Sequence, residues 1–336
     1  MLSMRRNSDA GFSLPELLIA MAIMLAISGA AVTALLKMQG AQATIWNRTQ
    51  MHSGIRGATE VLQQEVGQAG RIALPMNAAG VTYTVTMGAV GIGTNPATIT
   101  STKPTGDATE GMFNGQKLLV GVGANQETVT VTGAPSATQI TATFANAHNA
   151  GEPVLALGAF GTGIVPPDAG PTTYAPSSTA FTYTNGSNGT ILKLFGDINA
   201  DGNMVYIEYT CDFATSHNLY RNVMPWNTAF ASKPAVSASK VLLSNVMENP
   251  GSTPCFTYQT AIVGGAIYVT DVAITLTVQT QLIDPVTKRY QTQTKALLNV
   301  SPRNTFNAWQ MASLGISQRI QPMPPSISLL LPLVTP

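Results

Sequence analysis

An apolar run near the N-terminus is the first pattern in the chain. It extends from Phe12 to Leu36 and contains a single charged residue, Glu16. A run of this length can span a bilayer as a helix, at about 1.5 Å per residue. A carboxylate costs roughly 2.5–3.5 kcal/mol at the centre of a membrane helix, so its presence here indicates a specific role.

Beyond this run, the pattern continues with the period of a helix. Side chains of one face recur at intervals of three, four or seven residues, at Ile45, His52, Ile55, Thr59, Leu62, Val66 and Ala69. This spacing predicts an amphipathic helix. Gly54, Gly57 and Gly67 each weaken a helix by up to ~1 kcal/mol, so packing must hold it together. The helix is predicted to reach about residue 71 and to end by Pro75.

The rest of the chain alternates small apolar and hydroxyl side chains at a period of two, which predicts β-strands. The first group of such segments is VTYTVTM, KLLVGVG, ETVTVTG and TQITATF, and the second is MVYIEYT, KVLLSNV, AIYVTDVAITLTVQTQL and TQTKALLNV. Asp284 and Pro285 are predicted to start the turn between the last two long strands. A long helix before a mainly antiparallel sheet predicts an α+β fold, with the sheet packed on the C-terminal half of the helix.

These patterns divide the chain into successive segments. They are a polar N-terminal segment (1–11), a helix long enough to cross a membrane (12–36), its amphipathic continuation (37–75), a β-rich insert (76–165), a Pro-, Ser-, Thr- and Asn-rich loop (166–190), a C-terminal β-domain (191–317) and a Pro- and Leu-rich tail (318–336). The tail shows no periodicity and is predicted to be extended or disordered.

The residues at the start of the apolar run, GFSLPELLIAMAIM, resemble the class III signal of type IV prepilins and type II secretion pseudopilins. A short basic leader precedes Gly11, and Glu16 is the fifth residue after it. The resemblance implies that prepilin peptidase cuts after Gly11 and methylates Phe12, and that Glu16 neutralises the N-terminal amine of a neighbouring subunit. An ordinary secretory signal would place its cleavage site after the apolar core, and a plain membrane anchor gives no reason for Glu16.

A second segment, TEVLQQEVGQAGRIALP, is similar to the helix end of PilW-like minor pilins. The resemblance implies a minor pilin at or near the tip of a type IV pilus, which helps to prime assembly and presents the β-insert for adhesion. Its implied partners are prepilin peptidase, other major and minor pilins, the inner-membrane assembly machinery and a tip adhesin. It would be a single-pass inner-membrane precursor and then part of the extracellular pilus. The alternatives are a minor pseudopilin in a periplasmic pseudopilus, and a membrane-anchored exported binding domain or enzyme.

The composition agrees with an exported structural protein. Only 10% of the 336 residues are charged, and removal of the leader leaves equal numbers of basic and acidic side chains. This balance gives no basic footprint for nucleic acid. The chain contains no G-x-S-x-G, H-E-x-x-H, P-loop or C-x-x-C motif, and its three histidines, His52, His148 and His217, lie in separate regions. No enzymatic activity is therefore expected.

The two cysteines, Cys211 and Cys255, both lie in the C-terminal half of the chain. In an oxidising, exported compartment two cysteines are expected to form a disulfide. The alternative is a pair of unrelated buried thiols.

The segment GDINADGNMVYIEY has the spacing of an EF-hand-type calcium loop. Oxygen-bearing residues stand at loop positions one, three, five, seven and twelve, at Asp197, Asn199, Asp201, Asn203 and Glu208. Gly202, at position six, would permit the sharp turn, so the loop is predicted to bind Ca²⁺. The alternative is a hairpin turn without metal, because MVYIEY has the pattern of a strand rather than of an exiting helix.

Overall fold

The computed structural model describes residues 13–72, 83–103, 106–167 and 185–333. These residues form two compact units. The first contains the N-terminal part of the long helix, up to His52, together with the loop Thr280–Gln291. The second contains Ser53–Gln279 and the chain from Thr292 onward.

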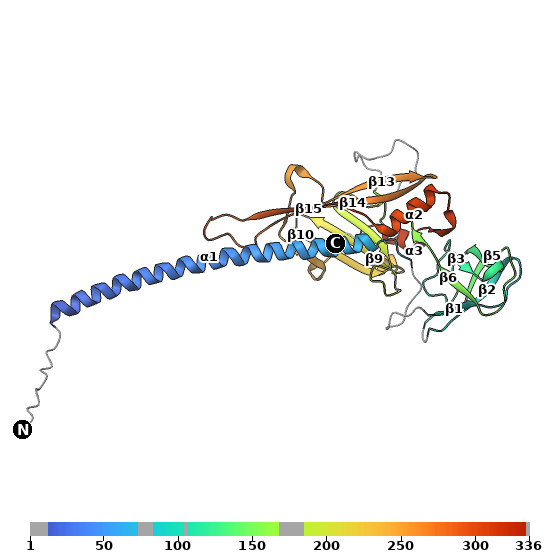
Figure 1. The fold of residues 1–336 in the computed structure, drawn as a ribbon, viewed down its shortest axis with the longest axis horizontal. Helices are drawn as coiled ribbons and strands as arrows, with labels where there is room; N and C mark the ends of the chain where they lie inside the picture. Colours follow the sequence, from blue (N-terminus) through green and yellow to red (C-terminus); the bar gives the residue numbers. More distant parts are fainter. Residues whose placement is uncertain (1–12, 73–82, 104–105, 168–184, 334–336) are drawn as a thin grey trace, which may run out of the picture. The chain divides into compact units, whose positions relative to one another are not determined.

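Helix α1 (Leu14–Gln68) begins in the first unit and continues into the second (Figure 1). In the first unit, the loop Thr280–Gln291 lies against it, because the Thr44 hydroxyl donates to Asp284 Oδ1 at 3.0 Å. Asp284 Oδ1 also accepts the backbone N–H of Val286 at 2.7 Å, which closes a turn. The turn predicted at Asp284 is therefore present.

Within the second unit, one face of α1 is buried. The predicted positions Ile55, Thr59, Leu62, Val66 and Ala69 are all buried. Ile45 and His52 are exposed, so the prediction was wrong for these two positions of the face. The periodicity of a helix does not reveal how far along its length a sheet covers it.

Two antiparallel sheets form the C-terminal part of the second unit. The first has the order β11-β10-β9-β8, with β8 (Ile191–Gly196), β9 (Val205–Asp212), β10 (Asn218–Pro225) and β11 (Val241–Ser244). In the second, β14 pairs with its three neighbours, and the strands are β12 (Val246–Met247), β13 (Phe256–Val263), β14 (Ala266–Gln279) and β15 (Thr292–Val300). A long helix followed by mostly antiparallel sheet confirms the α+β fold.

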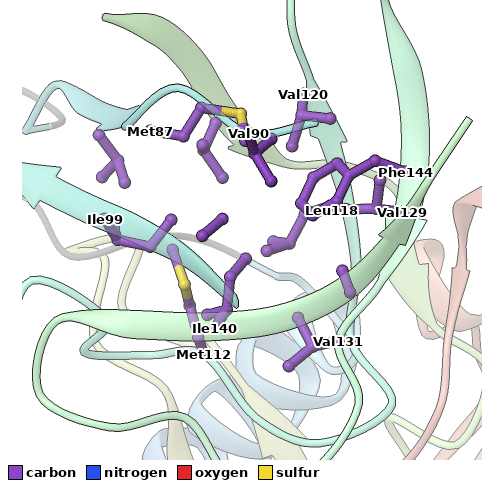
Figure 2. Close-up of a cluster of buried hydrophobic side chains, with 14 residues drawn as sticks. Met87, Val90, Ile99, Met112, Leu118, Val120, Val129, Val131, Ile140 and Phe144 are labelled. Atoms are coloured by element: carbon purple, nitrogen blue, oxygen red, sulfur yellow. The ribbon is translucent and has the colours of Figure 1, made fainter. Parts of the chain in front are cut away.

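The β-rich insert forms a six-stranded sheet of order β4-β3-β6-β1-β2-β5. The strands are β1 (Val85–Met87), β2 (Gly93–Ser101), β3 (Lys117–Val120), β4 (Glu127–Thr130), β5 (Gln139–Phe144) and β6 (Glu152–Ala156). A bridge between Val131 and Ala142 joins the two ends of this order, so the sheet closes on itself. Figure 2 shows its apolar interior, where Leu118, Ile140 and Phe144 are almost fully buried.

The described part of the C-terminal tail, residues 318–333, is folded, contrary to the prediction that the tail is extended or disordered. Strand β16 (Ile320–Gln321) pairs in parallel with β7 (Ala159–Phe160), and helix α3 (Pro325–Leu330) follows. Ile327 and Leu330 are completely buried in a cluster that includes Phe160. The tail is short, so its apolar residues show no period in the sequence, and they pack against residues that are distant along the chain.

Helix α2 (Arg303–Ser313) was not predicted, since it lies within the segment 191–317 that was predicted to be a β-domain. Its buried side chains are Thr305 and Ala308. Short 3-10 helices complete the described elements, at η1 (Gly123–Asn125), η2 (Phe230–Ser232), η3 (Ala238–Lys240), η4 (Pro250–Ser252) and η5 (Ser317–Arg319).

Candidate functional site

The predicted processing residues Gly11 and Phe12 lie outside the described residues, and the described chain begins at Ser13. Glu16 Oε2 accepts hydrogen bonds from the Ser13 backbone N–H at 2.9 Å and from the Ser13 hydroxyl at 2.8 Å. A serine followed three residues later by a glutamate that returns to its N–H forms part of a capping box, which stabilises the start of a helix. The S-x-x-E spacing of Ser13 and Glu16 is the sequence signal of this cap, which was not among the predictions.

The N-terminal part of α1 exposes almost all of its apolar side chains. Large apolar residues are more than half exposed, among them Leu14, Leu17, Leu18, Ile19, Met21, Ile23, Met24, Leu25 and Ile27. By length and composition, α1 is able to cross a membrane, and its most apolar window has a mean hydropathy of 2.3 with no residue buried. Such a surface is stable only in lipid or against other apolar helices.

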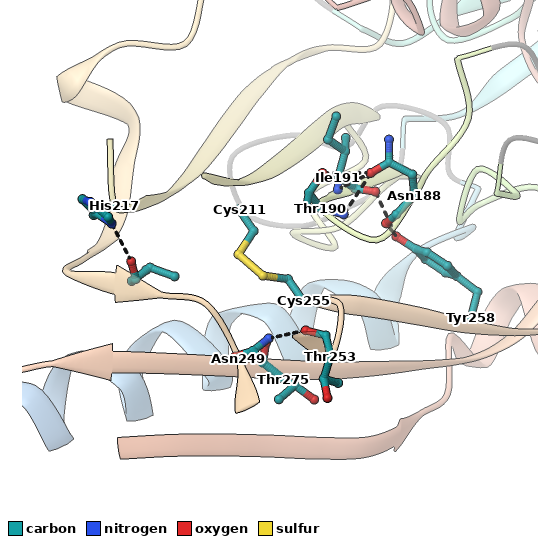
Figure 3. The surroundings of a disulfide bond; sticks show 11 residues. Asn188, Thr190, Ile191, Cys211, His217, Asn249, Thr253, Cys255, Tyr258 and Thr275 are labelled. Atoms are coloured by element: carbon teal, nitrogen blue, oxygen red, sulfur yellow. Dashed lines mark hydrogen bonds between the residues drawn. A yellow bond between two sulfur atoms is a disulfide. The ribbon is translucent and has the colours of Figure 1, made fainter. Parts of the chain in front are cut away.

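A disulfide links Cys211 and Cys255, as predicted (Figure 3). Cys211 lies in β9, and Cys255 directly precedes β13, so the bond connects the two C-terminal sheets. Both residues are almost fully buried. The Tyr258 hydroxyl supports the same connection, because it lies 2.9 Å from the carbonyl oxygen of Ile191 in β8.

The loop predicted to bind calcium is a tight turn that follows β8. Asp197 is fully buried, and its Oδ1 accepts the backbone N–H groups of Asp201 at 3.0 Å and of Gly202 at 3.2 Å. Its Oδ2 lies 3.4 Å from Arg71 Nε. Burial raises the pKa of Asp197, although Arg71 and the two backbone donors act in the opposite direction. Asn199, Asp201 and Asn203 are exposed.

Glu208, the predicted twelfth ligand, lies elsewhere. Val205 pairs with Gly196 at the start of this turn, and Glu208 is three residues further along β9, which corresponds to about 10 Å. Its Oε2 accepts hydrogen bonds from Lys233 Nζ at 2.9 Å and from the Tyr206 hydroxyl at 3.0 Å. The predicted five-residue ligand set is therefore not assembled. In the part of the chain that the structure describes, no three His, Cys, Asp or Glu side chains gather to hold a metal ion.

Two buried lysines near Glu208 hold the C-terminal tail. Lys233 Nζ donates to the carbonyl oxygens of Leu330 at 2.8 Å and of Pro332 at 2.7 Å, and Lys193 Nζ donates to that of Leu331 at 2.6 Å. A buried ammonium group needs acceptors, because it is costly to remove a charge from water without them. These contacts join the tail to β8 and to the chain after β10, and no pattern in the sequence indicates them.

A polar network joins α1 to the first C-terminal sheet. Glu65 lies on the buried face of the helix and accepts hydrogen bonds from the Tyr209 hydroxyl and from the Arg221 guanidinium. Burial raises the pKa of Tyr209. The sequence contains one signal of this network, because Glu65 stands beside Val66 on an otherwise apolar helical face.

A histidine in the insert contacts two carboxylates. His148 Nδ1 lies 2.6 Å from Glu152 Oε2, and its Nε2 lies 2.9 Å from Glu127 Oε1. Burial lowers the pKa of His148, but the hydrogen bonds to Glu152 and Glu127 outweigh this effect and raise the pKa above 6.5. Because both nitrogens donate only in the protonated ring, the geometry fits a charged imidazolium. These carboxylates lie in β4 and β6, so the histidine links the two strands.

Residues 6–32 match the family model of the prokaryotic N-terminal methylation motif. The matched segment includes Gly11, Phe12 and Glu16 and covers a small part of the chain. The motif implies processing by prepilin peptidase, and it supports a protein of the type IV pilin or pseudopilin type. Together with the apolar part of α1, it is consistent with a membrane-anchored precursor. No curated protein and no solved structure matches the chain.

Proposed function

We propose that the protein is a PilW-like minor pilin of a type IV pilus, processed after Gly11 and incorporated at or near the filament tip. The observation that supports this function best is the methylation motif on a helix whose apolar half is uncovered. Prepilin peptidase supplies the mature N-terminus. The same apolar surface then leaves the bilayer and packs against the helices of other pilins.

The size of the folded part supports a terminal position. Besides the C-terminal sheets, the chain carries a closed six-stranded insert. A bulky subunit crowds neighbours on all sides when it repeats through a helical lattice, and a tip position removes this constraint on one side. We assign the adhesive contact to this insert, which the chain carries in addition to the long helix and the C-terminal sheets. The role proposed for the protein is structural rather than enzymatic.

Glu16 has two successive partners in this proposal. Before assembly it caps its own helix through Ser13. In the filament it faces the N-terminal amine of Phe12 of a neighbouring subunit. Opposite charges that are paired in an apolar bundle cost far less than either charge alone, so the pair would fix the register between subunits.

The experiment is mass spectrometry and immunogold labelling of sheared surface filaments. We expect an N-methylated Phe12 as the first residue and gold particles at filament ends. An N-terminus at Met1 in assembled material would refute the processing. Labelling along the whole filament would refute the tip position, and recovery only from periplasmic pseudopili would show a minor pseudopilin of type II secretion instead. A protein that is processed at its N-terminus but never enters filaments would instead be a membrane-anchored exported binding domain or enzyme.

A further inference from the structure

The loop Thr280–Gln291 exposes several large apolar side chains. Leu282, Ile283, Val286 and Tyr290 are exposed by 62%, 52%, 65% and 48%, respectively. Single exposed apolar residues need no explanation, but a concentration of them on one short loop indicates a contact surface. None of these side chains contributes to the clusters of buried apolar residues in the second unit.

This loop has a defined place beside α1 in the first unit. Asp284, which is almost fully buried, accepts the Thr44 hydroxyl at 3.0 Å and lies 3.9 Å from Arg48 Nη2. Arg48 Nη2 also donates to Gln291 Oε1 at 3.2 Å. The exposed apolar residues of the loop are therefore held at the level of Thr44 and Arg48.

At the same level the helix itself exposes Ile45 and Trp46, by 65% and 73%. Trp46 follows Thr44 by two residues, so it is turned by about 200° and points away from the loop. A protein that docked on the loop would contact one side of α1 and leave Trp46 uncovered. A bilayer surrounds the helix on all sides at one depth and would cover both the loop and Trp46. The distribution of apolar side chains on both sides of α1 therefore favours lipid.

The distance from the apolar run also fits a membrane surface. The run ends at Leu36, and Lys37 is the first charged residue after it. Thr44 lies seven residues beyond Lys37, which corresponds to about 10 Å along a helix. The headgroup layer is about 5–8 Å thick on each side of the hydrocarbon. This level lies a few ångströms outside the headgroup layer. Side chains of a helix point back toward its N-terminus, so that of Trp46 extends toward the headgroups, where Trp and Tyr are enriched in membrane proteins.

The charge around the loop complements an anionic membrane. Residues 37–52 and 280–291 contain one acid, Asp284, and four basic residues, at Lys37, Arg48, Lys288 and Arg289. The whole chain has a formal net charge of only +1, so positive charge is concentrated here. All four basic residues are exposed. Basic residues beside a membrane helix are attracted by the negative surface potential of anionic phospholipids.

We propose that an interfacial patch, formed by Ile45, Trp46, Leu282, Ile283, Val286 and Tyr290, binds the headgroup layer of an anionic phospholipid bilayer. It is a second membrane contact of the anchored precursor, in addition to the spanning helix. The patch sets the depth at which α1 and the loop stand in the membrane before assembly. This inference depends only on the membrane-anchored state, which the pilin and pseudopilin functions share.

The test measures quenching of an added tryptophan by brominated lipid. The full-length chain is reconstituted in vesicles of phosphatidylethanolamine and brominated phosphatidylglycerol, and the emission of the parent chain is subtracted. Val286→Trp places the probe in the patch, and Val122→Trp places it at a similarly exposed position of the insert, which is 57% exposed compared with 65%. We expect at least about twofold stronger quenching for Val286→Trp. Leu282→Trp repeats the measurement if the first variant does not fold.

Charge reversal tests the lipid specificity. Lys288→Glu combined with Arg289→Glu should weaken the quenching of Val286→Trp in anionic vesicles and have little effect in vesicles of brominated phosphatidylcholine. Equal quenching of the patch and insert probes would overturn the proposal. Quenching of Val286→Trp no stronger in brominated vesicles than in unbrominated ones would also overturn it, because lipid would then not contact the patch. The processing of the N-terminus is unaffected by either result.

Discussion

A substitution in the C-terminal tail tests whether this segment belongs to the core. Leu330 has no exposed surface and packs in a cluster with Phe160 and Phe195, while its neighbour Leu329 is 66% exposed. The carbonyl oxygen of Leu330 also accepts a hydrogen bond from the buried Lys233. Leu330→Ala removes buried apolar atoms, and Leu329→Ala makes the same chemical change at the surface.

The magnitude follows from burial. Truncation of a fully buried leucine to alanine costs about 2–5 kcal/mol, from the lost transfer free energy and the cavity that remains. A loss of about 3 kcal/mol lowers the Tm of a domain of this size by roughly 6–12 °C, at 2–4 °C per kcal/mol. The exposed control should change the free energy of unfolding by no more than about 0.5 kcal/mol.

The assay is thermal unfolding of the full chain in detergent, followed by tryptophan fluorescence. Trp226 is a suitable reporter because it packs against the same cluster, with its ring centroid 5.9 Å from that of Phe113. Equal Tm values for Leu330→Ala and Leu329→Ala would refute the reasoning, because they would show that the tail does not contribute to the folded core.

Four further outcomes follow from the structure. The free energy of unfolding should decrease as the pH rises above 6.5. The pKa of His148 is raised in the folded protein, so the stabilisation by its two ion pairs is complete below 6.5 and is lost as the ring deprotonates. Urea titrations at several pH values measure this decrease, and His148→Gln should remove it. Cys211→Ser should cost about 4 kcal/mol in the same assay, because the bond closes a separation of 44 residues. The Tm should be the same with calcium and with chelator, both for the parent chain and for Asp201→Ala, because Glu208 is paired with Lys233. A Tm that rises with calcium in the parent chain alone would support the predicted calcium loop. Glu16→Val should be inserted and cleaved normally but enter filaments poorly, and normal incorporation on immunoblots of sheared filaments would contradict the pairing role.

Local patterns made part of this protein predictable. The processing segment is a continuous motif, so the sequence alone located Gly11, Phe12 and Glu16, and the family model covers the same residues. Strands and the long helix were predictable because their side chains repeat at periods of two and 3.6 residues. The disulfide was predictable because an exported chain with two cysteines has only one intramolecular pairing.

The candidate sites were less predictable where their partners are distant in sequence. A calcium loop was predicted from Asp197 to Glu208, but the strand pairing carries Glu208 away from the turn and toward Lys233. His148 lies far from the other two histidines in the sequence, and the closed sheet of the insert brings Glu127 and Glu152 to it. Such contacts depend on the register of strands, which sequence spacing does not specify.

The sequence by itself determined where the methylation motif lies, which part of α1 is apolar, and where several of the strands lie, because these properties depend on neighbouring residues. Only the tertiary structure decided which apolar residues are buried. Leu330 enters the core and Ile45 remains exposed, although both are aliphatic. The physical reason is that burial depends on what covers a side chain, and the covering residues come from elements far along the chain.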